Sequence, residues 1–511
     1  MLIKENLFKK YTDEETFNKI VNYKTINEMW EHCAREYAEE IAIEDAGQKY
    51  TYSKLDFDSA CFRSVLIDHG VKKGDRVCLL APSSYDFVKA FLAITTLGAT
   101  AVLLPVQLDE KTIFGCTMKF GAKTLVYENS LEAKLSVCNA MGVKTISTSE
   151  TASPEYMSMV NPEDDCCIIF TGGTTGKSKG ALLTHKAIMT GTVNGCYGYK
   201  DVFKQRYFLN LPLTHVFGLI RTMLTPLYTG STLYICRDLK NMFKEMAVFS
   251  PNILIMVPAL AEMALNLSKQ IGRHILGQNL KTIICGASHV PPHLIKEYKE
   301  IGVTMLPGYG LTESANLVSG NPESQRKPDS VGLPYPNQEL KIVNGELWLK
   351  GDNMLKCYVG EDEENQRAFE DGWFKTGDLV RIDEEGYLYI IGRIKEVIVL
   401  SSGENISPAE IELKFCAPEY IADTMVYEDY TENGEQILTL EVVIRMGYNV
   451  DEETIRKDLN QINMKLNPYQ RVNKIIIRDK DFDRTPAMKK IRIVKTKWWQ
   501  EMKLLKNYKI L

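Results

Sequence analysis

A glycine-rich loop at residues 170–180 constrains this chain more than any other segment. It reads Phe-Thr-Gly-Gly-Thr-Thr-Gly-Lys-Ser-Lys-Gly and follows the apolar run Cys166-Cys167-Ile168-Ile169. The apolar run predicts a short buried strand, and an apolar, helix-like stretch begins at Ala181. Glycines let consecutive backbone N–H groups turn toward one anion, and the threonines and lysines add hydroxyl donors and positive charge. The loop therefore predicts a polyphosphate-binding site, because a plain surface turn needs neither the lysines nor the hydroxyls.

The spacing within the loop separates two classes of phosphate-binding protein. Gly176-Lys177-Ser178 resembles the end of a Walker A motif, in which another glycine stands five residues earlier. Thr171 occupies that position, so a P-loop kinase or ATPase is the weaker interpretation. The phosphate loop of adenylate-forming enzymes, T-[SG]-G-T-T-G-x-x-K-G, fits residues 171–180 throughout and gives Lys179 a place.

Length, charge and composition limit the remaining function classes. The chain has 511 residues, a formal net charge of −5 and 45% hydrophobic residues, which predicts more than one domain and argues against a nucleic-acid or anionic-membrane surface. Residues 1–15 lack an apolar signal sequence, and the uncharged stretch 91–106 is short and contains Gly98 and Pro105. We therefore expect a cytoplasmic protein without stable membrane insertion. Scattered cysteines and histidines predict reduced thiols and no zinc site.

Helical patterns alternate with short apolar runs over the first two-thirds of the chain, which predicts βαβ units and mostly parallel sheets. The predicted strands are 76–80, 101–104, 253–257 and 282–285, and the predicted helices are 55–69, 86–97 and 259–267. Short strands over 330–359 predict a small β-rich subdomain. A boundary near Gly392 precedes an α+β module with strands at 397–400, 437–444 and 474–478 and helices at 408–415 and 452–466.

Five motifs together resemble the adenylate-forming superfamily of acyl-CoA synthetases, aryl-CoA ligases, luciferases and peptide-synthetase adenylation domains. They follow the loop 171–180 in the family's order and, together with it, extend over nearly the whole chain: 211–218, 308–313, 372–379, 392–395 with 402–412, and 484–489. The resemblance implies an α/β fold class with a large N-terminal domain, residues 1–392, of two doubly wound subdomains plus the β-rich one. It also implies a smaller mobile α+β domain, residues 393–511, that carries the catalytic lysine.

The resemblance assigns a nucleotide site. Residues that hold the ATP phosphates and later release pyrophosphate are Thr171, Gly172, Gly173, Thr174, Thr175, Gly176 and Lys179. Glu313 is expected to ligate Mg²⁺ and Thr312 to donate to the α-phosphate. Tyr309 and Gly310 are expected on the adenine, beside the segment Gly286-Ala287-Ser288. Asp378 would accept both ribose hydroxyls, with Arg393 on the ribose or phosphate. A helix start with a capping threonine is the structural alternative for Thr312 and Glu313.

The remaining implied residues belong to the acyl side and to the second domain. His215 resembles the gate beside the acyl pocket, with a structural histidine as the alternative. Lys489 stands where the family places the lysine that bridges carboxylate and α-phosphate, although Met488 replaces the usual preceding glycine. Lys395 falls at the hinge, and Gly403 is expected beside the CoA tunnel. Cys357 is a second departure, at a position where the family has glycine.

These motifs predict an acid–thiol ligase that uses ATP, Mg²⁺ and CoA. Carboxylate and ATP would give acyl-AMP and pyrophosphate, and a thiol would then capture the acyl group. The apolar segment 216–220 favours a fatty or aryl acid over an amino acid. We expect no attached carrier domain, so the expected acceptor is free CoA or a separate carrier protein, and CoA is favoured. Two alternatives stay open: an acyl-AMP ligase that loads a carrier protein, and a non-catalytic nucleotide-binding relative.

Overall fold

The computed structural model describes residues 7–155, 159–171, 179–271, 275–400, 404–431, 433–445, 447–484 and 490–492. The chain divides into two compact units. The first comprises Met1–Lys341, Trp348–Lys375 and Glu384–Leu388, and the second comprises Ile342–Leu347, Thr376–Asp383 and Tyr389–Leu511. The boundary predicted between residues 392 and 393 stays a prediction, and each unit is described by itself.

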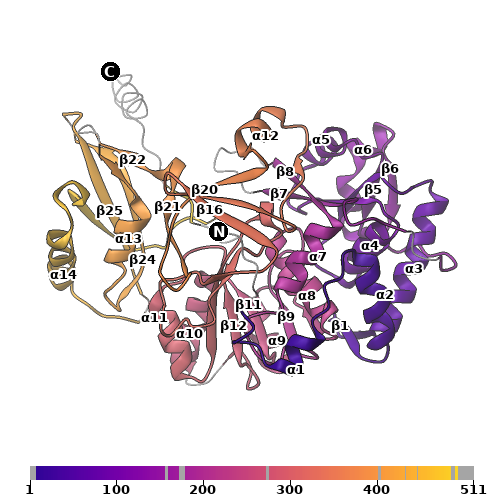
Figure 1. Ribbon diagram of the computed structural model, residues 1–511, viewed down its shortest axis with the longest axis horizontal. Helices are drawn as coiled ribbons and strands as arrows, with labels where there is room; N and C mark the ends of the chain where they lie inside the picture. Colours follow the sequence, from indigo (N-terminus) through magenta and orange to yellow (C-terminus); the bar gives the residue numbers. More distant parts are fainter. Residues whose placement is uncertain are drawn as a thin grey trace. The chain divides into compact units, whose positions relative to one another are not determined.

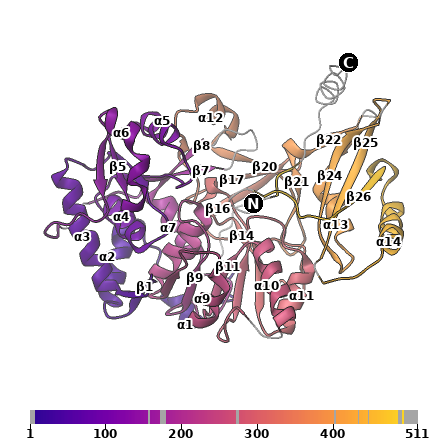
Figure 2. The same ribbon diagram turned by 180° about the vertical axis from the view of Figure 1, so that it is seen from behind.

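A seven-stranded sheet carries the phosphate-loop segment in the first unit. Its order is β18 (Cys357–Tyr358), β8 (Lys179–Thr184), β7 (Asp165–Thr171), β4 (Thr100–Leu103), β3 (Arg76–Leu80), β5 (Thr124–Tyr127) and β6 (Lys144–Ser147). The strands from β7 to β6 are parallel, as the alternating pattern predicts. Helices α2 (Ile26–Glu36), α3 (Tyr52–Asp68) and α4 (Tyr85–Thr96) lie side by side in the indigo and purple part of the chain (Figures 1 and 2). α5 (Glu110–Phe120) and α6 (Ser136–Ala140) pack against this sheet in one apolar core.

The segment after the phosphate loop differs from the prediction. Residues 179–184 form strand β8, antiparallel to β7, and helix α7 (His185–Asn194) begins only where the Thr184 side chain caps it. The prediction of a helical stretch from Ala181 is therefore wrong. The apolar residues between Lys179 and Thr184 are compatible with either a helix or a strand. Pairing with the buried neighbouring strand β7 favours the strand.

A nine-stranded sheet forms the second layer of the first unit. Its order is β15 (Leu333–Pro334), β14 (Ser319–Gly320), β13 (Thr304–Tyr309), β12 (Thr282–Cys285), β11 (Ile253–Met256), β9 (Arg206–Leu209), β10 (Thr232–Ile235), β1 (Ile41–Asp45) and β2 (Gln48–Thr51). The central strands are parallel and mostly apolar, as is typical of strands that helices cover on their faces. α9 (Met242–Phe249), α10 (Pro258–Ile271) and α11 (Pro292–Glu300) contribute to that core. α1 (Glu14–Lys19), α8 (Thr225–Tyr228) and α12 (Asp362–Ala368) complete the α-helices of the described part of this unit.

A five-stranded sheet corresponds to the predicted β-rich subdomain. Its order is β16 (Gln338–Val343), β17 (Glu346–Gly351), β20 (Trp373–Ile382) and β19 (Phe369–Glu370), and β21 (Leu388–Arg393) also pairs with β20. Residues of these strands fall in both units. The sheet carries Asp378 on β20 and Arg393 at the end of β21.

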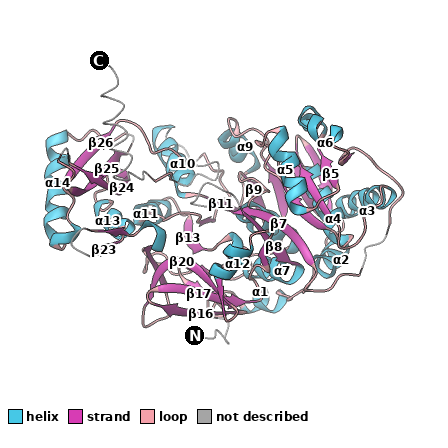
Figure 3. Ribbon diagram, turned by 90° about the horizontal axis from the view of Figure 1, so that it is seen from above, coloured by secondary structure: helices cyan, strands magenta, loops and turns pink. Residues whose placement is uncertain are grey.

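The second unit contains an α+β core. Strands β24 (Ile421–Tyr430), β25 (Gln436–Ile444) and β26 (Lys474–Arg478) form one sheet, and β22 (Ile398–Val399) pairs with β23 (Asn405–Ile406). Helices α13 (Pro408–Phe415) and α14 (Glu452–Lys465) pack on the sheet through Ile411, Phe415, Ile455 and Leu459 (Figure 3). The fold-class prediction of doubly wound α/β sheets with a smaller C-terminal α+β domain is confirmed.

Within the second unit, strand β24 is the main element that the sequence pattern does not predict. Asp423, Glu428 and Asp429 interrupt its apolar residues, which hides the alternation. The register between β24 and β25 shifts between Ile421 and Asp423, so this strand begins with a β-bulge. Among the described residues, no helix combines the length and the apolar character that crossing a lipid bilayer requires.

Candidate functional site

The flanks of the phosphate loop lie opposite each other. Thr171 ends β7, Lys179 begins β8, and the two residues are register partners. Lys179 Nζ lies 2.5 Å from Glu364 Oε1 and 5.2 Å from the centre of the Tyr358 ring. Gly172, Gly173, Thr174, Thr175 and Gly176 lie outside the described residues. The hairpin therefore brings both ends of the predicted phosphate loop together and places one lysine there.

The predicted magnesium carboxylate shares a neighbour with that lysine. Glu313 belongs to the 3₁₀ turn η3 (Thr312–Ser314), and its Oε1 accepts a 2.7 Å hydrogen bond from the Tyr358 hydroxyl. Burial and the Glu313 charge raise the pKa of Tyr358 above its ordinary value, so the phenol stays protonated and donates. Tyr358 thus touches Glu313 through its hydroxyl and Lys179 through its ring.

The turn around Glu313 also tests the structural alternative, in which Thr312 caps the start of a helix. The hydroxyl that caps this turn belongs to Ser314, which accepts from the backbone N–H of Leu311 at 3.0 Å. Thr312 is therefore not the capping residue. Gly310 is required where it stands, because a Cβ there would lie 1.2 Å from the carbonyl oxygen of Asn316.

Three predicted segments meet at Gly286. A Cβ at this position would lie 3.2 Å from the carbonyl oxygen of Gly308 and 3.6 Å from Cζ of Phe217. Gly286-Ala287-Ser288 therefore lies beside the segment that leads to Tyr309 and beside the one that follows His215. Ala287 has φ +69°, a left-handed conformation that is costly for a residue with a Cβ and clusters at functional sites.

His215 directly precedes a π-helix, η2 (Phe217–Leu224). The half-buried histidine donates its backbone N–H to Pro212 O at 3.1 Å, and its carbonyl accepts from Leu219. Gly218 allows the close approach of this helix, since a Cβ there would lie 2.2 Å from Pro212 O. π-helices are rare and are frequent at functional sites.

Sequence reasoning missed Arg221, which lies in the middle of η2. Its side chain is 1% exposed. The available signal was a single arginine that interrupts the otherwise uncharged run from Val216 to Tyr228. Such a residue is costly to bury, so its presence points to a specific role.

In the second unit, two predicted ribose-site residues contact each other directly. Arg393 Nε lies 2.7 Å from Asp378 Oδ1, and the Asp378 side chain is 2% exposed. Thr376 supports the carboxylate segment by accepting from the backbone N–H of Asp378 at 3.1 Å. Lys395 lies in the 3₁₀ turn η4 (Ile394–Glu396), a short helix type that is frequent in connecting segments. Gly403 lies outside the described residues.

We expect Asp378→Asn to raise the KM for ATP about 30-fold, because the amide neither balances the Arg393 charge nor accepts as a carboxylate does. The readout is ATP–pyrophosphate exchange at saturating acid. Asp383→Asn is the matched control, since Asp383 accepts a 3.1 Å hydrogen bond from Tyr389 in the same sheet. An unchanged KM in the Asp378 variant would contradict a ribose role.

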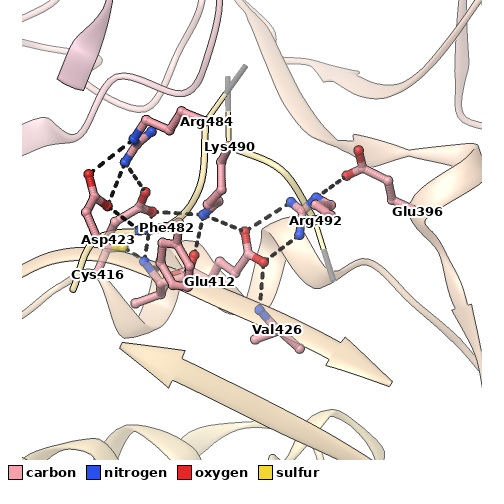
Figure 4. A network of polar contacts seen from close by, with 11 residues as sticks. Glu396, Glu412, Cys416, Asp423, Val426, Phe482, Arg484, Lys490 and Arg492 are labelled. Carbon is pink, nitrogen blue, oxygen red and sulfur yellow. Dashed lines mark hydrogen bonds and ion pairs between the residues drawn. The ribbon is translucent and has the colours of Figure 1, made fainter. Parts of the chain in front are cut away.

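Lys489 lies outside the described residues, but both flanks of its segment are fixed. Arg484 and Lys490 form an isolated antiparallel bridge. Asp423 on β24 pairs with both, at 2.9 Å to Arg484 Nη2 and 2.8 Å to Lys490 Nζ (Figure 4). Lys490 also donates to the carbonyl of Thr424. One carboxylate therefore holds both ends of the segment 485–489.

A second carboxylate extends this network. Glu412 on α13 forms a two-point ion pair with Arg492, at 2.7 and 3.1 Å, and accepts from the backbone N–H of Val426 (Figure 4). Arg492 continues to Glu396 at 2.7 Å. Glu412 is buried, so the pair is protected from solvent and the geometry is well defined.

We expect Asp423→Asn to lower the rate of acyl-AMP formation about tenfold, because small displacements of a catalytic group cost rate steeply. Thioester formation from supplied acyl-AMP should change less than twofold. Glu452→Gln is the control, because Glu452 forms an exposed pair with Arg456 in the same unit. Equal losses in both half-reactions would show that Asp423 has only a general structural role.

The residues around Glu313 fit a magnesium ion. Mg²⁺ is usually held by one or two carboxylates together with substrate phosphates and water. Over the described part of the chain, no three His, Cys, Asp or Glu side chains gather into a cage. A single carboxylate beside the flanks of the predicted phosphate loop matches the magnesium pattern.

Comparisons with known proteins agree with this geometry. A family model described as "AMP-binding enzyme" matches residues 30–359. A probable CoA ligase, CCL5, from Humulus lupulus is 27% identical over 86% of this chain and 87% of its own length. An oxalate–CoA ligase from Arabidopsis thaliana is 27% identical over 84% of this chain and 91% of its own. The structure of o-succinylbenzoate CoA synthetase from Bacillus subtilis, in complex with its acyl-adenylate intermediate, matches with a TM-score of 0.76 and 25% identity, over 91% of this chain and 96% of that one.

Proposed function

Because this chain belongs to the AMP-binding enzyme family, we propose that it is an AMP-forming acid–CoA ligase. It converts a carboxylate and ATP into acyl-AMP and pyrophosphate, and it then transfers the acyl group to the CoA thiol with release of AMP. ATP and CoA are its cosubstrates and Mg²⁺ its metal ion. The oxalate–CoA ligase and the o-succinylbenzoate CoA synthetase are named for different acids, so the family alone leaves the acid open.

The observation that carries the proposal is the convergence around Tyr358 and Gly286 in the first unit. Tyr358 contacts Glu313 and Lys179, and Gly286 adjoins the Gly308 and Phe217 segments. A carboxylate for the cation and a lysine for phosphate are groups that attack on an α-phosphate needs, and Gly286 lets the predicted adenine and acyl segments approach each other closely.

Each residue has a proposed role in this reaction. Thr171 to Gly176 and Lys179 hold the phosphates, and Thr312 donates to the α-phosphate. Glu313 would hold Mg²⁺, which would supply positive charge to neutralise the phosphates. Tyr309, with Gly310 and the segment 286–288, receives the adenine. Asp378 and Arg393 bind the ribose, while His215 borders the acyl pocket. Lys489 bridges the carboxylate and the α-phosphate, Lys395 is the hinge and Gly403 lines the CoA tunnel.

The departure at Cys357 is compatible with this proposal. Cys357 lies on the edge strand β18, directly before Tyr358, and pairs with Leu182 on β8. Burial raises the pKa of its thiol, so the group stays a small, weakly polar neighbour of the sheet. The departure at Met488 lies outside the described residues.

ATP–pyrophosphate exchange with a panel of short, medium, long and aromatic acids tests the proposal. We expect acid-dependent exchange and CoA-dependent AMP release. ATP binding without exchange for any acid would overturn it in favour of a non-catalytic relative. If a phosphopantetheinylated carrier protein outcompetes CoA, the thiol acceptor is the carrier protein rather than CoA. A fatty or aryl acid and a cytoplasmic location stay predictions.

A further inference from the structure

Arg221 is a fully buried cation with no counter-charge among the residues that the structure describes. Its Nη2 donates to the Tyr199 hydroxyl at 2.9 Å, and its guanidinium lies 5.3 Å from the centre of the Tyr199 ring. Its Nε and Nη1 have no hydrogen-bond partner among the described residues. The charged or ionisable groups that act on it are tyrosines, and no carboxylate of the described chain pairs with it. A buried guanidinium with two unsatisfied donors is costly unless something else binds it.

A second buried polar side chain near Arg221 is also unsatisfied. Asn194, at the end of α7, is 1% exposed, and neither its Oδ1 nor its Nδ2 has a partner in the described structure. The next residue, Gly195, approaches Arg221 so closely that a Cβ there would lie 2.9 Å from Nη1. The end of α7 and the helix η2, which meet at Gly195, thus each carry a buried polar side chain with unsatisfied atoms.

A third such group connects this place to the predicted magnesium turn. A Cβ at Gly191 would lie 2.3 Å from Ala315 O, so α7 packs against the residues that follow Glu313. Asn194 follows Gly191 by three positions and lies on the same face of α7. Asn316, next to Ala315, is buried and has an unpartnered Nδ2. Three segments that surround the proposed reaction site therefore each contribute an unsatisfied polar group.

Helix η2 links Arg221 to the acyl side of the site. Phe217 begins this helix and adjoins Gly286. Residues five apart are bonded along a π-helix, so Arg221 stands about one turn beyond Phe217 and on a similar face. The helix thus runs from the predicted gate at His215 to the buried guanidinium.

We propose that Arg221 binds a second carboxylate on the acid substrate, with Asn194 and Asn316 as supporting hydrogen-bonding groups. The substrate class is then a dicarboxylic acid, activated at one carboxylate and held at the other. A carboxylate matches the planar guanidinium with two parallel hydrogen bonds and supplies the missing charge. This inference rests on the proposed ligase function, and it replaces the plain fatty or aryl tail that the apolar run 216–220 suggests.

Matched acids that differ only in the distal group test the inference. The pairs are hexanoate with adipate and phenylacetate with 4-carboxyphenylacetate. Binding is measured by calorimetry in the presence of α,β-methylene-ATP, which cannot transfer its AMP group to the acid, and turnover by pyrophosphate exchange with ATP. The variants are Arg221→Met and Arg221→Lys. Arg63→Met is the control, because Arg63 is equally buried, at 1% exposure, with one unpartnered nitrogen on α3.

We expect the wild type to bind at least one dicarboxylate about 30-fold more tightly than its matched monocarboxylate. Arg221→Met should remove or reverse this preference without weakening monocarboxylate binding, and Arg221→Lys should retain part of it. Arg63→Met should lower the melting temperature and leave the preference unchanged. Binding that depends on Arg221 but gives no exchange would support the acid site and overturn the ligase function.

The inference is overturned if the wild type binds no dicarboxylate more tightly than its partner, whether or not exchange occurs. That result would mean that water alone satisfies the buried groups. It is equally overturned if Arg221→Met weakens both members of each pair alike, since this would identify Arg221 as a structural residue.

Discussion

Lys489→Ala is expected to lower acyl-AMP formation by about 10³-fold, the usual cost of removing an electrostatic group that acts on the charge of the transition state. The attack joins a carboxylate to an α-phosphate, and the ammonium group is the proposed cation that both anions share. Thioester formation from supplied acyl-AMP should stay within about twofold of the wild type, since the mixed anhydride already exists in that step. Pyrophosphate exchange and CoA-dependent consumption of synthetic acyl-AMP measure the two half-reactions separately.

Lys480→Ala is the control for this change, because Lys480 is an exposed lysine of the same unit. It should leave both half-reactions unaltered. Equal losses in the two half-reactions of the Lys489 variant would show that Lys489 lacks the divided role. Full exchange activity would point to Lys490 or to no lysine at all.

Glu313→Gln is expected to lower pyrophosphate exchange on the order of 10²-fold and to raise the Mg²⁺ concentration needed for half-maximal rate. The amide oxygen still accepts from the Tyr358 hydroxyl, so the turn keeps the 2.7 Å contact that fixes it. The substitution removes the negative charge of the carboxylate, and a hard cation such as Mg²⁺ binds a charged oxygen ligand more tightly than a neutral one. A magnesium titration at fixed ATP separates this effect from a fall in stability.

Glu361→Gln provides the comparison, since Glu361 pairs with Lys119 at 2.6 Å on the surface of the same unit. It should leave the magnesium dependence unchanged. A Glu313 variant with normal magnesium dependence and a lower melting temperature would assign Glu313 to the fold rather than to the metal.

Much of the fold could be predicted because the buried parallel strands are short apolar runs. The predictions at 282–285, 408–415 and 474–478 agree with β12, α13 and β26 residue for residue. Strand β24 could not be predicted, because its acidic residues interrupt the apolar pattern and form ion pairs with residues far along the chain. Asp423 is one of them, and its partners Arg484 and Lys490 become neighbours only after the sheet forms.

The residues of the candidate site divide in the same way, into those that the local sequence predicts and those that depend on contacts between distant segments. Motif spacing leads to Glu313, Asp378 and Arg393, and the last two lie in direct contact. Spacing says nothing of Tyr358, whose contact with Glu313 depends on an edge strand pairing with β8. It also says nothing of Arg221, because whether an arginine is buried without a counter-charge is a property of packing.

The bulge at the start of β24 has a consequence for how this family member tolerates change. Side chains alternate between the two faces of a strand, so the one extra residue, Ala422, sets the face of Ile421 relative to that of Asp423. Deleting Ala422 would remove the bulge, so that either the start of the strand or the Asp423 carboxylate would have to move. The ion pairs of Asp423 with Arg484 and Lys490 thus depend on a single inserted residue some sixty positions earlier in the chain, where a change of length would act without altering any residue that meets a substrate.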